Sequence, residues 1–427
     1  MNIIVGIANV AFIAFISYLL WQRDHSPLKT YYWPALLFKL MSGIALGLLY
    51  TYYYDGGDTF NYFNDGVKLA NIARKDVASY FSFLWSGDES VPIWSELNYK
   101  QPRAMFLSKA TSLFCLLTSD SYWVISLHFS FISFLCTWML ARKILKLNPD
   151  AVFATALAFF FFPSIVFWSS GVIKESLAMA AMFFLCVIFL QLWLKEKVGL
   201  IKWLVSAFAI WVLWNLKYYY LGVFLPVAAT ALLAKWIFAR MKYQHMVLKI
   251  VLWCIILIGP LFLISTLHPN FYPERFLQVV VSSYNEFHAI SHERNAIHYP
   301  SMDPTFITLV QNIPFAIFSG LYRPLITEAT TVLQVLSSIE NFLLLVLTIS
   351  VLTQIKHLVR GNHRLLTFSL LAYVLILCVF LALSTPNFGT LSRFRIGFLP
   401  FFVFLLTSQN RLVTRLIKPN RPTHLVP

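Results

Sequence analysis

The sequence predicts an all-α membrane protein, a polytopic helical bundle of about eleven spans with two long outer-face loops bearing surface helices. The first observation is composition, because 59% of the 427 residues are hydrophobic and only 12% are charged. The second is a mean hydropathy of +0.70, which is typical of chains whose apolar runs cross a bilayer. The third is that Lys and Arg gather in the short loops between those runs.

The formal net charge of +15 follows from these loops. Basic residues that are spread over short inter-span loops indicate membrane orientation, whereas nucleic-acid binding needs a concentrated basic surface. We therefore expect the lipid bilayer as a partner and no nucleic acid. The five cysteines are scattered through apolar segments without paired spacing, so they are expected as small core residues.

The first two spans set the orientation. The first covers 2–21 and ends at a short basic turn that contains Arg23 and Lys29, which should be cytoplasmic. The second, 32–54, therefore ends on the outer side. The remaining spans are expected at 122–140, 151–168 with a kink at Pro163, 177–194, 200–214, 219–237, 247–267, 332–355, 365–383 and 396–406.

This order places the N-terminus outside and the C-terminus in the cytoplasm of an inner (cell) membrane. Residues 1–427 form a single transmembrane domain in this interpretation, because no linker or fixed-period repeat divides the chain. Two segments are too polar to cross: 55–120, the first outer loop, with interfacial helices over 67–85 and 104–117, and 268–328, the second outer loop. Within the second, the apolar stretch 311–324 is short and is expected to be re-entrant or interfacial.

The first outer loop opens with two carboxylates, Asp55 and Asp58, on either side of Gly56 and Gly57. Two glycines let the backbone turn tightly, so both carboxylates can point at one place. A carboxylate at such a position can take a proton from an acceptor hydroxyl, or two together can bind a divalent cation. The competing interpretation is an ordinary hydrophilic turn in which Asp58 or Thr59 caps the next helix.

Basic residues also occur at the predicted outer ends of spans, where the positive-inside rule disfavours them. Such residues are candidates for binding an anion, and Arg is suited to bidentate contacts with phosphate oxygens. The alternative for each is a side chain that reaches the interface or pairs with an acid, as Lys174 could with Glu175. The candidates are Lys174, Lys217, Arg323, Arg393 and Arg395.

A pair of histidines, His288 and His292, has the i, i+4 spacing of a zinc site. No His-Glu-x-x-His signature accompanies the pair, and His298 lies beyond it. We expect a solvated helix or a lid here.

Three segments together carry a resemblance to a known family. They are Asp55-Gly56-Gly57-Asp58-Thr59-Phe60-Asn61-Tyr62, then Phe162-Pro163-Ser164-Ile165-Val166-Phe167-Trp168 with Gly171 and Lys174-Glu175, and Asn387-Phe388-Gly389-Thr390-Leu391-Ser392-Arg393-Phe394-Arg395. With these segments the chain resembles the GT-C superfamily of integral membrane glycosyltransferases, which depend on polyprenyl-phosphate sugars. The resemblance is architectural over most of the chain and low in motif specificity. One difference is that the acid follows the second span here, whereas in that family it commonly follows the first.

The resemblance implies inverting transfer of a sugar from a polyprenyl-phosphate-linked donor to a glycan, lipid or protein acceptor at the outer (periplasmic) face. Asp58 or Asp55 would be the base, and Arg393 or Arg395 would contact the carrier phosphate. Lys174, Lys217, Arg323 and Tyr62 complete the substrate-binding candidates. No cofactor is certain, and a divalent cation at Asp55 and Asp58 is an open alternative.

Two other functions remain open. Polymerases and ligases of O-antigen or exopolysaccharide share a multi-span plan with outer arginines. A transporter of lipid-linked saccharides would instead need polar groups within the spans, for which Lys39, His128 and Glu340 are the candidates.

Overall fold

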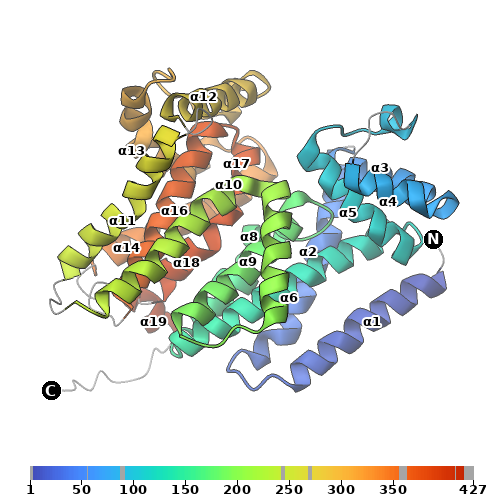
Figure 1. Cartoon of the computed structure of the whole chain (residues 1–427), viewed down its shortest axis with the longest axis horizontal. Helices are drawn as coiled ribbons and strands as arrows, with labels where there is room; N and C mark the ends of the chain where they lie inside the picture. Colours follow the sequence, from blue (N-terminus) through green and yellow to red (C-terminus); the bar gives the residue numbers. More distant parts are fainter. Residues whose placement is uncertain are drawn as a thin grey trace. The chain divides into compact units, whose positions relative to one another are not determined.

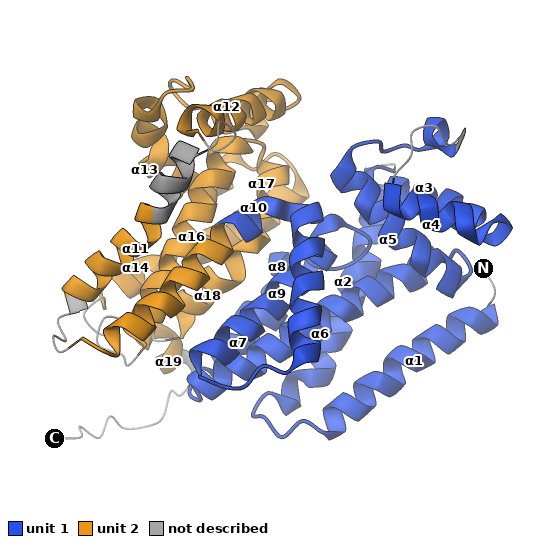
Figure 2. Ribbon diagram, viewed as in Figure 1, with its two compact units in different colours: residues 1–222 blue, residues 223–427 orange. Residues whose placement is uncertain are grey.

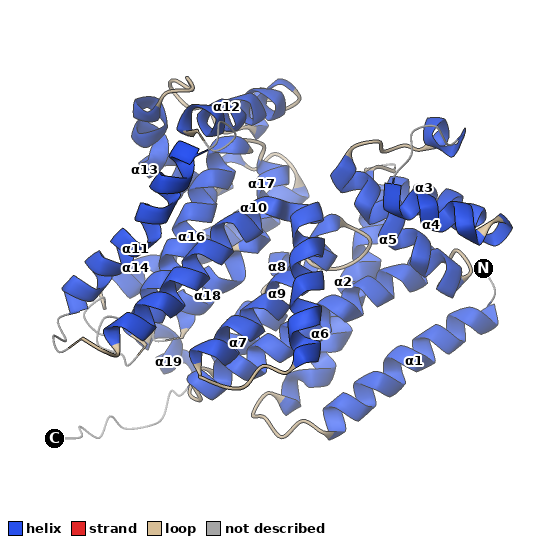
Figure 3. Cartoon of the chain, viewed as in Figure 1, coloured by secondary structure: helices blue, strands red, loops and turns tan. Residues whose placement is uncertain are grey.

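The computed structural model describes residues 3–54, 56–86, 92–241, 246–267, 272–354, 363–408 and 410–417. Every regular element within these ranges is a helix (Figure 3). An isolated β-bridge between Ala296 and Asn387 is the exception. The predicted all-α class is confirmed for the part of the chain described.

The chain forms two compact units, Met1–Gly222 and Val223–Pro427 (Figure 2). The boundary falls inside one long helix, α10, which covers Leu200–Phe238. Each unit has its own packed interior, and the predicted single transmembrane domain stays a prediction.

Unit 1 contains the predicted first outer loop and the spans on either side of it (Figure 1). Its elements are α1 (Ile3–Gln22), η1 (Lys29–Tyr31), α2 (Tyr32–Tyr52), α3 (Asp58–Lys75), α4 (Val77–Ser86), η2 (Pro92–Glu96), α5 (Pro102–Thr118), α6 (Tyr122–Leu147), α7 (Val152–Ala156), η3 (Leu157–Phe161), α8 (Pro163–Trp168), α9 (Lys174–Trp193) and the first part of α10.

Unit 2 contains the rest of α10 and the predicted second outer loop. Its further elements are α11 (Met246–Leu267), α12 (Pro273–Ala289), η5 (Glu293–Asn295), α13 (Phe306–Tyr322), η6 (Ile326–Glu328), α14 (Val332–Leu352), α16 (Arg364–Ser384), α17 (Phe388–Phe394), η7 (Arg395–Gly397), α18 (Leu399–Thr407) and α19 (Arg411–Ile417).

Seven helices of the described residues are long and apolar enough to cross a membrane, and a bent pair brings the number to eight. These helices indicate a membrane-embedded protein. They are Ile3–Gln22, Lys29–Tyr52, Tyr122–Leu147, Lys174–Trp193, Leu200–Phe238, Val332–Leu352 and Arg364–Ser384, and the bent pair joins Phe388–Gly397 to Leu399–Thr407 at 68°.

The predicted count of eleven spans stays a prediction. Two expected spans, 200–214 and 219–237, fall together in α10. Two others, 151–168 and 247–267, contain shorter apolar helices at Val152–Phe161 and Val247–Gly259.

The expected kink at Pro163 corresponds to a complete break. The helix preceding it ends in a π-helical turn, Leu157–Phe161, and Phe162 is extended at φ −76° and ψ 115° before Pro163 opens α8. A proline disfavours the helical conformation in the residue before it but fits the first turn of a helix, which explains both sides of the break.

The predicted helix over 67–85 is instead two helices, α3 and α4. They meet at Asp76, whose backbone is extended and whose Oδ1 accepts the Ala78 N–H at 2.9 Å. The Asp76 side chain therefore caps the start of a second helix, α4, where the apolar periodicity alone predicts that one helix continues. Leu69 on α3 and Phe83 on α4 pack in one core with Met105 of α5.

Contacts within unit 1 define two opposite ends along α6. At one end Thr59 bonds both the Tyr122 hydroxyl, at 2.8 Å, and the Val172 carbonyl, at 2.9 Å. At the other end Lys143 pairs with Glu196. Tyr122 and Lys143 are separated by about 30 Å at about 1.5 Å per helical residue, which matches the thickness of a bilayer core.

Candidate functional site

Asp58 is the first residue of α3, and its side chain is half-buried. Gly57 precedes it with φ 106°, a backbone conformation that favours glycine, and acts as the N-cap residue without a side-chain cap bond. Neither Asp58 nor Thr59 is therefore the N-cap, and the capping interpretation is wrong. A carboxylate in the first turn is stabilised by the helix dipole. Asp55, the other predicted carboxylate, lies outside the described residues.

Tyr99 is the principal partner of Asp58. Its hydroxyl donates a hydrogen bond to Asp58 Oδ1. Its ring also lies against Tyr62, one turn further along α3, with the ring centroids 4.8 Å apart. Sequence reasoning includes Tyr62 but misses Tyr99, because one tyrosine in a polar loop carries no spacing signal.

Asp65 holds the segment that carries Tyr99. This carboxylate is fully buried and accepts hydrogen bonds from the Asn98 backbone and side-chain N–H groups, at 2.9 and 2.8 Å, and from the Tyr99 N–H at 3.1 Å. A buried carboxylate with several donors is satisfied, and removing those donors is costly. Asp65 therefore fixes Tyr99 against α3.

Lys174 approaches the same group from α9. Its Nζ lies 5.6 Å from the centre of the Tyr62 ring, a cation–π arrangement. The turn before α9 contains Gly171 at φ 75°, whose N–H donates to Ser130 Oγ at 2.9 Å. The structure thus brings Asp58, Tyr62, Tyr99 and Lys174 together at one end of unit 1.

Lys217 has a carboxylate partner, Glu175, at 2.7 Å, and both side chains are buried. The sequence suggests Lys174 as a partner of Glu175, and the structure pairs Glu175 with Lys217. Lys217 itself interrupts α10, with φ −146° and ψ 63°, where the sequence predicts a tight turn between two spans. The role of Lys217 in substrate binding stays a prediction.

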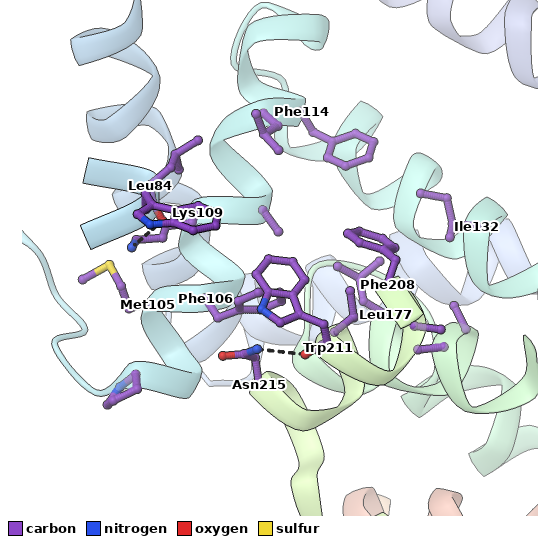
Figure 4. A pocket seen from close by; sticks show the side chains of 18 of the residues that line it. Leu84, Met105, Phe106, Lys109, Phe114, Ile132, Leu177, Phe208, Trp211 and Asn215 are labelled. Atoms are coloured by element: carbon purple, nitrogen blue, oxygen red, sulfur yellow. Dashed lines mark hydrogen bonds between the residues drawn. The ribbon is translucent and has the colours of Figure 1, made fainter. Parts of the chain in front are cut away.

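A cavity of about 1070 Å³ lies in unit 1 between α4, α5, α6, α9 and the first part of α10 (Figure 4). Its wall is mostly apolar and aromatic, with Lys100, Lys109 and Asn215 as its main polar side chains. Lys100 directly follows Tyr99 in the chain. The cavity was not predicted, since the sequence does not show which apolar faces are left unfilled.

The remaining candidates belong to unit 2. Arg323 makes a bidentate ion pair with Glu328, with Nε to the two carboxylate oxygens at 2.9 and 3.0 Å, and its guanidinium lies 5.1 Å from the Phe388 ring centre. Burial alone would raise the pKa of Glu328, but the hydrogen bonds from Arg323 and from the Leu325 N–H outweigh burial and lower the pKa.

Arg395 is fully buried. Its Nη1 donates to Asn341 Oδ1 at 2.5 Å, and its Nη2 lies 3.9 Å from Glu340. Arg393, two residues earlier, is also largely buried, with 9% of its surface exposed. Of the two arginines predicted to contact a phosphate, Arg395 is therefore already engaged with the interior of its own unit.

In the second outer loop His288 contacts His298 rather than His292, its partner in the i, i+4 spacing, and His298 also contacts the backbone. His288 Nε2 and His298 Nδ1 are 3.0 Å apart, and His298 Nε2 lies 2.7 Å from the Glu293 carbonyl oxygen. Among the described residues, no group of three or more His, Cys, Asp or Glu side chains could hold a metal ion.

Comparison with protein-family models, curated proteins and solved structures finds no match to this chain. Over the residues described, the fold defines a helical protein whose long apolar helices indicate that it is embedded in a membrane.

Proposed function

We propose that the chain is a membrane glycosyltransferase that moves a sugar from a polyprenyl-phosphate-linked donor to a glycan, lipid or protein acceptor. In this proposal it crosses an inner (cell) membrane about eleven times, with the N-terminus outside and the C-terminus in the cytoplasm. Transfer takes place on the outer side.

The observation that carries the proposal is the group around Asp58. A carboxylate that is oriented by a tyrosine hydroxyl and lies near a lysine and aromatic rings suits proton transfer at a membrane boundary. Tyr62 and Tyr99 offer aromatic faces of the kind on which apolar faces of a ligand can pack. Lys174 supplies a positive charge in the same group.

The transfer step uses Asp58 as the base. The acceptor oxygen forms a bond to the anomeric carbon of the sugar, and the bond from that carbon to the phosphate oxygen breaks. The leaving polyprenyl phosphate takes the electron pair, and the acceptor proton passes to Asp58. Lys174 stabilises the negative charge that grows on the leaving group.

The two ends of unit 1 support the orientation. The group around Asp58 lies at the Tyr122 end of α6, whereas Lys143 and Lys146 pair with Glu196 at the far end. Basic residues collect on the cytoplasmic side, which leaves the Asp58 end for the outer side.

The polar groups within the predicted spans favour an enzyme over a transporter. Lys39 donates to Ser169 Oγ at 2.5 Å, and His128 bonds Asn9 at 2.7 Å. Glu340 lies beside Arg395. Partners inside the fold give these groups structural roles.

The test is transfer of a labelled sugar from polyprenyl-phosphate donors by the whole chain in nanodiscs. Asp58→Asn keeps size and hydrogen bonding but removes the basic charge, so turnover should fall by at least about 10² while donor binding remains. Asn61→Asp, on the same turn of α3, controls for a change of charge in this region. Transfer by Asp58→Asn at the wild-type rate would overturn the proposal.

A further inference from the structure

The cavity of unit 1 reaches from the Asp58 end into the apolar depth of the bundle. Its wall includes Ile132 of α6, Phe184 of α9 and Val205 of α10, and all three helices are candidate spans. Along α10 the lining runs from Asn215 to Val205, about 15 Å at about 1.5 Å per residue. The volume of about 1070 Å³ is that of a large ligand pocket.

The cavity opens toward the surroundings of the protein. Several lining side chains are exposed, among them Leu113 at 44%, Phe208 at 61% and Trp211 at 53%. Phe106 of α5 and Trp211 of α10 meet edge to face, with ring centroids 4.9 Å apart, so the two walls touch at this point. Phe208 and Trp211 belong to a candidate span, so the solvent expected around them is lipid, and an apolar space of this size then holds lipid rather than water.

The charged side chains of the cavity wall are both basic. Lys100 and Lys109 line it, and no acidic residue does so among the described residues. Lys109 is half-buried, its Nζ donates to the Leu84 carbonyl at 3.0 Å (Figure 4), and burial lowers its pKa. An ammonium group has three donors, so Lys109 retains hydrogen-bonding capacity for an anion.

We propose that this cavity binds an anionic phospholipid of the surrounding bilayer, with an acyl chain along α10 and the phosphate at Lys100 and Lys109. Bilayer lipids are the most concentrated amphiphiles near the opening, so even a weak site is filled by mass action. The two lysines select against zwitterionic lipids, whose head groups carry a positive charge next to the phosphate.

The cavity lining includes Lys100, the neighbour of Tyr99, but none of Asp58, Tyr62, Tyr99 and Lys174, and the proposal does not depend on sugar transfer. Lipid binding and transfer are therefore measured independently. A phospholipid in this position packs against α5 and the segment that precedes it and so stabilises them.

The test uses the whole chain in phosphatidylcholine nanodiscs with a phosphatidylglycerol probe that carries a photoreactive group on its acyl chain. Cross-links should map to the cavity-facing residues of α9 and α10. Ala209→Phe fills the cavity from α10 and should reduce labelling several-fold. Ala207→Phe, on the same helix but exposed and outside the lining, is the matched control and should label as wild type.

Competition on the wild-type chain tests head-group selection without any variant. Unlabelled phosphatidylglycerol should displace the probe at lower concentration than phosphatidylcholine does. Lys100→Ala and Lys109→Ala should each reduce that preference by roughly fivefold. Lys75→Ala, exposed at the end of α3 and outside the lining, should not change it.

Three results would overturn the proposal. One is equal labelling of Ala209→Phe and the wild type. Another is equal competition by the two phospholipids. The third is displacement by polyprenyl phosphate at a much lower concentration than by phosphatidylglycerol, which would assign the cavity to a lipid-linked donor instead.

Discussion

Tyr99 links the two carboxylates of α3: its hydroxyl donates to Asp58, and its backbone N–H donates to Asp65 at 3.1 Å. Asp58 and Asp65 are about two turns apart, so they lie on the same face of the helix. Asp58, the candidate base, is therefore oriented by Tyr99, and Tyr99 is itself held in place by Asp65 of the same helix.

Tyr99→Phe tests this relationship. The variant keeps the ring against Tyr62 but loses the hydroxyl that orients Asp58. We expect kcat to fall about tenfold with little change in KM, because the lost contact positions the base rather than the substrate. Steady-state transfer kinetics measure this, with Tyr53→Phe, an exposed tyrosine at the end of α2, as the control. An unchanged kcat would show that Asp58 needs no orienting partner.

The two arginines of unit 2 should behave differently. Arg395→Ala removes a fully buried guanidinium that lies 3.9 Å from Glu340, so we expect a loss of about 3–5 kcal/mol in unfolding free energy. Glu340→Gln in the same chain should recover part of that loss. Thermal unfolding in detergent measures both.

Arg393→Ala should instead weaken the apparent affinity for the lipid-linked donor by roughly tenfold to a hundredfold, as expected for a lost charge-assisted contact. Arg393→Lys should restore the affinity only in part. Donor titration of folded protein measures this. Wild-type donor affinity in Arg393→Ala would make this arginine a structural residue.

Cysteine labelling on intact cells checks the orientation. A cysteine in place of Ser86, at the end of α4, should react with a membrane-impermeant maleimide, whereas one in place of Lys197, after α9, should not. The five native cysteines are buried or half-buried, so labelling of the chain without an added cysteine measures the background reaction. The opposite labelling pattern would reverse the membrane orientation.

Acid should destabilise the Lys143 end of unit 1. Hydrogen bonds from Lys143 and Lys146 lower the pKa of Glu196 to about 2, from its usual 4.5. Because the folded pKa is the lower one, the contribution to stability is complete above about pH 4.5 and is lost as the pH falls toward 2. Unfolding temperatures across this range should fall less for Glu196→Gln than for the wild type. If the unfolding temperature fell equally with pH in both proteins, the ion pair of Lys143 and Glu196 would add nothing to stability.

The sequence predicts the helical class and most apolar helices, because apolar runs and basic loops are local signals. It also locates the turn at Lys217 and the break near Pro163. The prediction of one helix over 67–85 is wrong for a local reason. In an amphipathic pattern, a carboxylate that caps the next helix cannot be distinguished from any other polar residue on the exposed face.

Partners distant in sequence could not be predicted. Lys217 meets Glu175, and Arg395 meets Glu340, only because helices from different parts of the chain pack together. A Lys or Arg at the outer end of a span predicts that an anion binds near it. The sequence does not show whether that anion is a substrate or a carboxylate of the same chain. The apolar cavity is also a product of packing, so its lysines gave no signal in sequence.

The ion pair of Lys217 and Glu175 also constrains how the chain is assembled. Each charge alone would oppose burial next to the bilayer, while the two together are largely neutral. Glu175 lies in the first turn of α9, and Lys217 lies at the interruption of α10, so we expect the helical hairpin between them to enter the membrane as one unit. Removal of either side chain would leave the other charge buried without this ion pair, which opposes insertion of the hairpin.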